Sequence, residues 1–296
     1  MAATIIDGKK IAQEMQNEMR ADVNALLEKG VIPCLEVILV GENPASQVYV
    51  RNKEQACNRI GVKSETRRLP YDTSEEEILR LIEVFNRDPK VHGILVQLPL
   101  PDHVNEGAVL NTIDPEKDVD GFHPVNVGRM VVGEPGFLPC TPHGIQILLI
   151  RSGIETKGKH VVVVGRSNIV GKSVANILLQ KKEGANAVVT VVHTAAPDMS
   201  VFTRQADILI VAAGRPEMIT ADMVKEGVVV IDVGVNRVED PSKEKGFRLT
   251  GDVDFEGVSK KASYITPVPG GVGPMTITML LQNTIESAKI LSSKKL

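Results

Sequence analysis

Four short apolar segments in series dominate the second half of the chain and most constrain its fold. They read KHVVVVG (159–165), NAVVTVVH (186–193), ADILIVAAG (206–214) and GVVVIDVG (227–234). Runs of this length that are apolar throughout are typical of strands covered on both faces. Because such strands in series form a parallel sheet flanked by helices, this half is predicted to be an α/β layer structure.

The first half of the chain shows the same alternation. Strands are predicted at 34–40, 63–69 and 91–100, and helices at 46–61 and 73–88. This βαβαβ order indicates a second parallel sheet. A stretch rich in Pro and Gly, Asp114 to Gly144, is typical of a domain junction. A length of 296 residues agrees with about two domains.

Composition argues against several classes of protein. A net charge of −3 and 3% aromatic residues without Trp give no reason to expect nucleic acid or an anionic membrane as partner. Three widely spaced cysteines without a CxxC pair indicate no metal site and favour a reducing compartment. The first residues lack the apolar run of a signal peptide, so a cytoplasmic protein is expected.

The segment VVVVGRSNIVGKSVANILL combines a strand, a glycine turn and a helix, the context of a dinucleotide-binding fingerprint. Its spacing departs from G-x-G-x-x-G, because Ser167 takes the second glycine position and Gly171 falls one place late. A purely structural turn therefore remains an alternative. His193 and Thr194 end the next strand where NAD sites tend to carry an acid, and with Arg166 they favour NADP. A solvated loop histidine is the alternative for His193.

The predicted helix at 46–61 carries a lysine in its apolar stripe. Tyr49, Cys57 and Ile60 share one face at helical spacing, and Lys53 lies among them. Gln97, near the carboxyl end of a predicted buried strand, needs a partner because an unsatisfied buried amide costs about 1–3 kcal/mol. We expect that partner to be Lys53. The alternatives are a lysine that reaches solvent from the core and an amide that caps a loop.

Two further segments contain candidate binding residues. EKDVDGF contains Asp118 and Asp120; Asp120 either stabilises an Asx turn or accepts paired N–H donors from an aminopyrimidine-like ring. TPVPGGVGPMT places three glycines directly before a helix, where backbone free of side chains can approach a ligand closely. A plain helix-entry loop is the alternative for this second segment.

Five motifs together resemble the bifunctional methylenetetrahydrofolate dehydrogenase/methenyltetrahydrofolate cyclohydrolase family: YVRNK, VHGILVQLPLP, PEKDVDGFHPVNVG, VVVVGRSNIVGKS and ITPVPGGVGPMT. The resemblance implies an α/β fold with a catalytic, folate-binding domain (1–141 plus 275–296), a Rossmann-like NADP-binding domain (142–274) and a cleft between them. It also implies a homodimer formed through the NADP domains. The implied reactions are NADP-dependent oxidation of 5,10-methylenetetrahydrofolate and hydrolysis of the methenyl product to 10-formyltetrahydrofolate.

The resemblance also assigns residues. The implied catalytic residues are Lys53, Tyr49, Gln97 and Asp120. The implied folate-binding positions are Tyr49, Val50, Arg51, Asn52, Lys53, Val96, Gln97, Leu98, Asp120, Pro269, Gly270, Gly271, Val272 and Gly273. The implied NADP-binding positions are Gly165, Arg166, Ser167, His193, Thr194 and Val235. The family often has serine where Thr194 stands, and the hydroxyl is retained.

Two rival interpretations remain open at the level of sequence. A shikimate-type or amino-acid-type NADP dehydrogenase has a similar two-domain layout and a catalytic lysine, but its small carboxylated substrates call for anion-binding side chains. A catalytically silent NADP-binding protein is the rival from another class. Such a protein has no need of Lys53 and Gln97 together.

Overall fold

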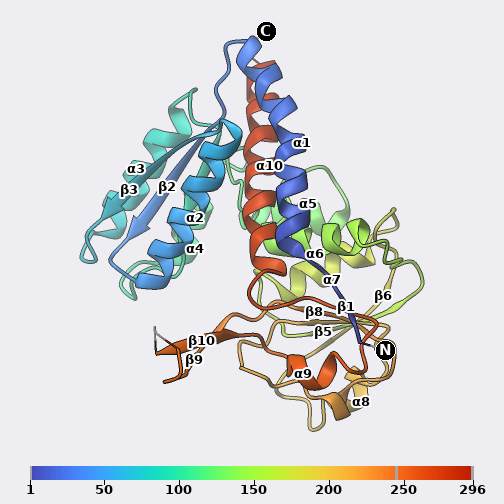
Figure 1. Ribbon diagram of the computed structural model, residues 1–296. Coiled ribbons are helices and arrows are strands. Elements are labelled where there is room, and N and C mark those ends of the chain that lie inside the picture. Colours follow the sequence, from blue (N-terminus) through green and yellow to red (C-terminus); the bar gives the residue numbers. More distant parts are fainter. Residues whose placement is uncertain (1, 244–245, 295–296) are drawn as a thin grey trace. The chain divides into compact units, whose positions relative to one another are not determined.

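The structure is a computed structural model that describes residues 2–243 and 246–294 (Figure 1). The described chain divides into two compact units, each with its own parallel sheet. Both halves are therefore α/β, as predicted. We call them the three-stranded unit and the six-stranded unit; the first contains Gln13–Cys140 and the residues from Ile277 on, and the second contains Thr141–Thr276 and the residues up to Ala12.

The sheet of the three-stranded unit has the order β3-β2-β4, and both pairings are parallel. β2 (Cys34–Val40) and β3 (Lys63–Leu69) coincide with the predicted strands. β4 (Gly93–Val96) is shorter than the predicted 91–100. The backbone N–H of Gln97 still bonds to β2. The chain leaves the ladder after this residue, because Pro99 has no N–H to donate.

Helices cover this sheet and account for its core. α2 (Pro44–Ile60) begins at Asn43, whose side chain accepts from two backbone N–H groups, and ends at Gly61 in the left-handed conformation. The core contains Ile38, Ile78 and Phe85. The other helices are α1 (Gly8–Glu28), α3 (Glu75–Arg87), α4 (Glu106–Thr112), α5 (Pro124–Val132) and α10 (Val272–Ser293).

Two of these helices, α1 and α10, run side by side (Figure 1). The Gln16 amide on α1 donates to the Thr278 hydroxyl on α10 at 2.9 Å, and both residues are buried. Near the other end, Lys289 pairs with Asp22 at 3.2 Å. The described part of the three-stranded unit therefore combines segments from the two ends of the sequence.

The sheet of the six-stranded unit has the order β1-β11-β8-β7-β5-β6, with every pairing parallel. The four apolar segments become its middle and one edge, as predicted. β1, at the other edge, was not anticipated, because the sequence placed residues 1–141 together in the other domain. The strands are β1 (Thr4–Ile5), β5 (His160–Val164), β6 (Val188–Val192), β7 (Ile208–Val211), β8 (Val229–Asp232) and β11 (Tyr264–Ile265).

The remaining elements of this unit are helices and one antiparallel pair of strands. β9 and β10 form a separate two-stranded antiparallel sheet. Among residues 2–243 and 246–294, no helix is long and apolar enough to span a lipid bilayer. The elements are α6 (Cys140–Arg151), α7 (Gly171–Leu179), α8 (Ser200–Thr203), the 3-10 helix η1 (Ala221–Met223), β9 (Asn236–Glu239), β10 (Phe247–Thr250) and α9 (Phe255–Val258).

The strand order of each sheet reverses once, and ligands bind outside the carboxyl ends of parallel strands at such points. In the six-stranded sheet the reversal lies at β5, because β6 flanks it on one side and β7 on the other. In the three-stranded sheet it lies at β2, between β3 and β4. Topology alone therefore directs attention to the residues that follow β5, β2 and β4.

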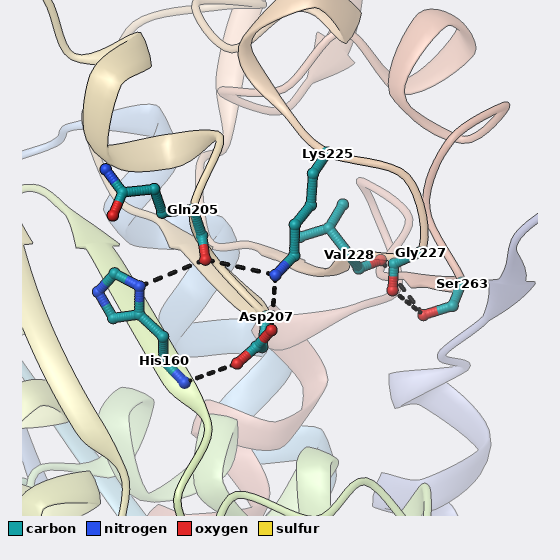
Figure 2. A network of polar contacts seen from close by, with 7 residues as sticks. All are labelled: His160, Gln205, Asp207, Lys225, Gly227, Val228 and Ser263. Atoms are coloured by element: carbon teal, nitrogen blue, oxygen red, sulfur yellow. Dashed lines mark hydrogen bonds and ion pairs between the residues drawn. The ribbon is translucent and has the colours of Figure 1, made fainter.

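The amino-terminal edge of the six-stranded sheet is tied together by polar contacts (Figure 2). The Asp207 carboxylate accepts from the backbone N–H of His160 at 2.8 Å and from Lys225 Nζ at 2.6 Å. The Ser263 hydroxyl donates to the carbonyl of Gly227 at 2.8 Å. These contacts join the starts of β5, β7, β8 and β11, at the end of the sheet opposite to the one where a ligand is expected.

Candidate active site

The turn after β5 has the tight backbone that a dinucleotide needs. Gly165 has φ +122°, and a Cβ there would lie 2.2 Å from the carbonyl oxygen of Ala212. A Cβ on Gly171 would lie 2.2 Å from the carbonyl oxygen of Gly165. Both positions therefore require glycine, even though their spacing differs from G-x-G-x-x-G. The Ser167 hydroxyl accepts from the N–H groups of Val170 and Gly171, at 3.2 and 3.4 Å, where α7 begins.

The other predicted cofactor residues also follow strands of this sheet. Arg166 and Thr194 are exposed after β5 and β6, and Val235 is exposed after β8. His193 is partly buried, and its Nδ1 accepts from the Ala195 N–H at 3.3 Å. A glycine turn with an exposed guanidinium and hydroxyl along one sheet edge fits a phosphorylated dinucleotide.

Two buried aspartates that the sequence did not single out organise the same edge. Asp252 is fully buried, and its Oδ2 accepts from the N–H groups of Ala213 and Gly214, at 2.7 and 2.8 Å, after β7. Asp232, the last residue of β8, accepts from the N–H groups of Asp252 and Gly234, at 2.9 and 3.0 Å. Burial raises the pKa of Asp232 to about 7. Asp232 lies within the apolar run GVVVIDVG, so no sequence signal distinguished it.

The three-stranded unit contains the predicted lysine and glutamine pair. Lys53 Nζ donates to Gln97 Oε1 at 3.1 Å. The amide nitrogen of Gln97 donates to the Leu98 carbonyl at 2.7 Å, which turns the amide oxygen toward the lysine. Both side chains are partly buried. The hydrogen bond expected from the sequence is therefore present, between the middle of α2 and the first residue after β4.

Asp120 is close enough to Lys53 for the two charges to interact. Burial lowers the pKa of Lys53, and the negative charge of Asp120 opposes that shift. Burial likewise raises the pKa of Asp120, and the Lys53 ammonium opposes it. Each group is driven toward its neutral form by desolvation and held in its charged form by the other. A pair whose charges are opposed by burial and supported by each other is suited to proton exchange.

Cys140 is a neighbour of this pair that sequence reasoning missed. Its thiol is buried, donates to the Val119 carbonyl at 3.2 Å, and has a pKa raised by burial and by Asp120. Cys140 was considered only in the count of three cysteines. Its position beside Asp120 results from folding of the junction segment, and no spacing in the sequence indicates it.

The rest of α2 divides between core and solvent. Val50 is buried, and Arg51 and Asn52 are exposed. Tyr49, which the sequence places on the same face as Cys57 and Ile60, is 45% exposed. The helix buries Ser46, Val50, Ala56, Cys57 and Ile60, and Tyr49 lies about 100° around the helix from Val50.

The predicted glycine loop belongs to the six-stranded unit. Gly270 has φ +108°, and its carbonyl accepts from the Lys9 N–H at 2.9 Å. A Cβ on Gly271 would lie 2.7 Å from the Pro267 carbonyl oxygen, whereas a Cβ on Gly273 would meet open space. Pro269 and Gly273 are exposed, and Val272 is buried as the first residue of α10.

A cavity of about 810 Å³ opens at the carboxyl edge of the three-stranded sheet. It follows β2, β3 and β4 at the point where the strand order reverses. Of the predicted site residues, Val96 lies buried at the end of β4 and Leu98 is partly buried just before this lining. The lining residues are Leu39, Val40, Gly41, Glu42, Asn43, Gln47, Arg68, Leu69, Pro70, Tyr71, Pro99, Leu100, Pro101 and Asp102.

Comparison with protein families gives two matches that together cover most of the chain. Residues 6–120 match the catalytic domain of tetrahydrofolate dehydrogenase/cyclohydrolase. Residues 139–292 match the NAD(P)-binding domain of the same enzymes. Both matches agree with the contacts described above: the lysine–glutamine pair lies in the first range and the glycine turn after β5 in the second.

Individual proteins match over nearly the full length. The chain is 60% identical over 286 residues to the bifunctional protein FolD of Prosthecochloris aestuarii, covering 96% of this chain and 97% of that one. It resembles the crystal structure of the bifunctional FolD of Campylobacter jejuni with a TM-score of 0.92 and 52% identity, covering 98% and 99%.

A further structure, from Trypanosoma brucei, is a methylenetetrahydrofolate dehydrogenase-cyclohydrolase complexed with NADP and an inhibitor. It matches with a TM-score of 0.93 and 42% identity, covering 98% of each chain. By contrast, a shikimate dehydrogenase structure is 13% identical with a TM-score of 0.50, a likeness of fold alone. The shikimate-type alternative is therefore not favoured.

Proposed function

Because the chain belongs to the tetrahydrofolate dehydrogenase/cyclohydrolase family, we propose that Lys53, Gln97 and Asp120 carry its two reactions on folate. The first reaction oxidises 5,10-methylenetetrahydrofolate with NADP⁺ to the methenyl cation. The second hydrolyses that cation to 10-formyltetrahydrofolate. The observation that supports the assignment best is the 3.1 Å hydrogen bond between Lys53 Nζ and Gln97 Oε1, beside the partly buried carboxyl of Asp120.

The oxidation step demands positioning more than side-chain chemistry. When bound, the oxidised nicotinamide supplies the hydride acceptor. The chain's part is to hold the methylene carbon against it, with the hydrogen aligned for transfer. We assign this task to Asp120, which accepts N–H donors of the pterin ring, and to Tyr49, whose exposed ring offers a stacking surface. The loop from Pro269 to Gly273 is proposed as a further folate contact.

The hydrolysis step demands proton transfer. Water adds to the cationic amidine carbon and forms a C–O bond, and it must lose a proton as it does so. The ring C–N bond then breaks, and the released nitrogen must gain a proton. An amine whose pKa is lowered by burial can accept the first proton and return the second. Gln97 keeps Nζ aimed at the reacting carbon while leaving its charge state free to change.

The cofactor is proposed to lie along the carboxyl edge of the six-stranded sheet. Gly165 gives the pyrophosphate access to the backbone, and Ser167 borders the start of α7. Arg166 and Thr194, with His193, are proposed to bind a 2′-phosphate, which favours NADP over NAD. Val235 offers an exposed apolar contact from the loop after β8.

The proposal extends to assembly and location. β6 is an edge strand whose Val188 side chain is 60% exposed, and edge strands with apolar surface tend to pair. We propose a homodimer in which β6 strands meet, and Val188→Lys is expected to yield monomers in sedimentation. If this variant sediments like the wild type, pairing through β6 is wrong. The buried free thiols Cys34, Cys57 and Cys140 support a reducing compartment such as the cytoplasm.

One spectrophotometric experiment tests the central proposal. The protein is mixed with 5,10-methylenetetrahydrofolate and either NADP⁺ or NAD⁺, and reduced nicotinamide is followed at its own absorbance. Turnover with NADP⁺ that exceeds turnover with NAD⁺ is the expected result. Hydrolysis is followed separately as loss of added methenyltetrahydrofolate. Shikimate and NADP⁺ form the comparison arm; turnover there and none with the folate would reject the proposal, and a silent protein would show neither.

A further inference from the structure

Asp118, two residues before Asp120, is almost completely buried and hydrogen-bonded throughout. Its side chain is 1% exposed. Oδ1 accepts from the N–H groups of Gly121 and Phe122, at 3.2 and 3.3 Å. Oδ2 accepts from the His123 N–H at 2.8 Å and from the Asn126 amide at 2.9 Å. All four donors come after Asp120 in the chain. Their hydrogen bonds to the Asp118 carboxylate therefore close a ring of backbone that includes Asp120.

The turn has little room to relax. Gly121 has φ +78°, and a Cβ at this position would lie 2.5 Å from the carbonyl carbon of Leu138. The backbone after Asp120 is thus fixed by a left-handed residue packed against a neighbouring segment. The Asx-type hydrogen bonds of this turn go to Asp118. The carboxyl of Asp120 is therefore available for a role other than shaping the turn.

The residue before Asp118 also holds this segment in place through hydrogen bonds. The Lys117 ammonium is buried and donates to the carbonyls of Phe85, Asn86 and Asp88, at 2.8–2.9 Å, where α3 ends. Asp118 itself forms a parallel bridge with Ile94 on β4.

Asp118 also acts on Asp120 through its charge. Burial is the largest cause of the raised pKa of Asp120; the Lys53 ammonium lowers that pKa, and the neighbouring carboxylate of Asp118 raises it further. A carboxylate that held only the start of α5 would need no such proximity. The position of Asp118 therefore affects both the direction and the charge of the Asp120 side chain.

We propose that Asp118 is a positioning residue for folate binding, holding the backbone around Asp120 so that the Asp120 carboxyl faces Lys53 and the pterin. This inference rests on the proposed function only for the identity of the ligand. The competing explanation is that Asp118 stabilises the start of α5 and does nothing for Asp120. The two explanations differ in what happens to folate affinity as pH changes.

The test compares Asp118→Asn with Asp114→Asn. Asp114 lies in the same segment, and its side chain accepts from the Glu116 N–H, upstream of the ring around Asp120. The readouts are the Kd of tetrahydrofolate by fluorescence titration from pH 5 to pH 9, the Kd of NADP⁺, and stability to urea. Because the folate readout is binding, it is independent of turnover, and the wild-type turnover assay judges the proposed function separately.

Asp118→Asn is expected to raise the tetrahydrofolate Kd about fivefold or more at pH 8, the effect of a lost hydrogen bond or two. Removing the Asp118 charge lowers the pKa of Asp120, so the weakening of folate binding in acid begins at a lower pH than in the wild type. The NADP⁺ Kd is expected to stay within about twofold, as are all values for Asp114→Asn. If Asp118→Asn shows the same tetrahydrofolate Kd as Asp114→Asn, and its binding weakens in acid at the same pH, the inference is overturned.

A second variant keeps the test decisive if Asp118→Asn does not fold. Asn126→Ala removes one donor to Oδ2 and leaves the Asp118 charge in place. It is expected to raise the tetrahydrofolate Kd about threefold without changing the pH at which folate binding weakens in acid. An unchanged Kd in a folded Asn126→Ala protein counts against positioning by Asp118.

Discussion

Lys53 and Gln97 are joined by a 3.1 Å hydrogen bond in which the lysine donates and the amide oxygen accepts. Because this acceptor carries no charge, it orients the Lys53 amine without favouring the ammonium form as a carboxylate would. The full charge near the amine is that of Asp120, whose own pKa is raised by burial. The geometry thus separates the orientation of Lys53 from its protonation.

Lys53→Met is expected to lower the rate of methenyltetrahydrofolate hydrolysis by about 10²-fold or more, the range of general acid–base catalysis. NADP⁺ affinity should persist, because the cofactor residues lie on another sheet. The rate is measured as loss of the methenyl absorbance. Lys63→Met is the matched control, since Lys63 is an exposed lysine of the same unit that pairs with Glu65. A wild-type rate in Lys53→Met would exclude Lys53 from the chemistry.

Gln97→Glu is expected to shift the pH–rate profile of hydrolysis toward higher pH. The new carboxylate faces the ammonium directly and raises the pKa of Lys53, so the neutral amine forms only in more alkaline solution. At neutral pH the rate should fall about tenfold for every pH unit by which the profile moves. Gln55→Glu adds the same charge at an exposed position of α2. Identical profiles for the two variants would contradict the prediction.

Asp120→Ala is expected to raise the KM for methylenetetrahydrofolate about tenfold or more, because charge-assisted hydrogen bonds to the pterin are lost. NADP⁺ affinity is expected to stay within about twofold. Initial rates at varied folate give the KM, and fluorescence titration gives the NADP⁺ Kd. Asp72→Ala removes an exposed carboxylate of the same unit as control. Equal losses for both ligands would indicate a folding defect instead.

Arg166→Ala is expected to weaken NADP⁺ binding about tenfold or more while leaving NAD⁺ binding within about twofold. The guanidinium is exposed at the turn after β5, where it can form paired hydrogen bonds with a 2′-phosphate. Titration of each nucleotide against the wild type and the variant checks this, and NAD⁺ serves as the internal control. If both nucleotides weaken in parallel, Arg166 contributes to the shared part of the site.

Asp232 is expected to make stability fall as pH rises. Burial raises its pKa to about 7 in the folded chain, so the folded state retains a proton that the unfolded chain releases near pH 4. Its contribution to the free energy of unfolding is fully present below about pH 4 and is lost as pH rises through about 7. At 1.36 kcal/mol per pKa unit, this contribution amounts to about 4 kcal/mol.

In Asp232→Asn an amide that does not titrate replaces the carboxyl group, so no proton is released at this position as pH rises. Urea unfolding from pH 4 to pH 8 should therefore show the wild-type free energy of unfolding falling relative to that of the variant. Other titrating groups cancel in the comparison, because both proteins share them. Parallel curves across this range would mean that the Asp232 carboxyl titrates at its ordinary pKa.

Local pattern predicted the elements that contain most of the candidate site. β2 has the predicted bounds because its apolar run ends at Gly41. β3 is mostly polar, and its bounds follow from its place between Gly61, which ends α2, and Pro70. The partnership of Lys53 and Gln97 followed from two polar groups placed where apolar ones were expected. Of the apolar face predicted for α2, Cys57 and Ile60 are buried, whereas Tyr49 near the start of the helix is exposed.

Other features depend on contacts that no local pattern encodes. β1 has two residues, too few for any periodicity, and its pairing with β11 depends on the complete sheet. Cys140 approaches Asp120 because the junction segment doubles back, as the hydrogen bond from the Cys140 N–H to the Asp120 carbonyl shows. Asp232 accepts from the backbone N–H groups of Asp252 and Val253, whose positions next to β8 follow from tertiary structure.

The pairing of β1 with β11 also bears on how the chain is made. Thr4 and Ile5 are translated some 260 residues before their partners Tyr264 and Ile265. At about 5–20 residues per second, the amino-terminal segment waits on the order of 10–50 seconds for the strand it joins. Once β8 has been made, the nascent sheet keeps an open edge on that strand until Tyr264 follows about 35 residues after Val229, and a chaperone or a neighbouring nascent chain can reach that edge.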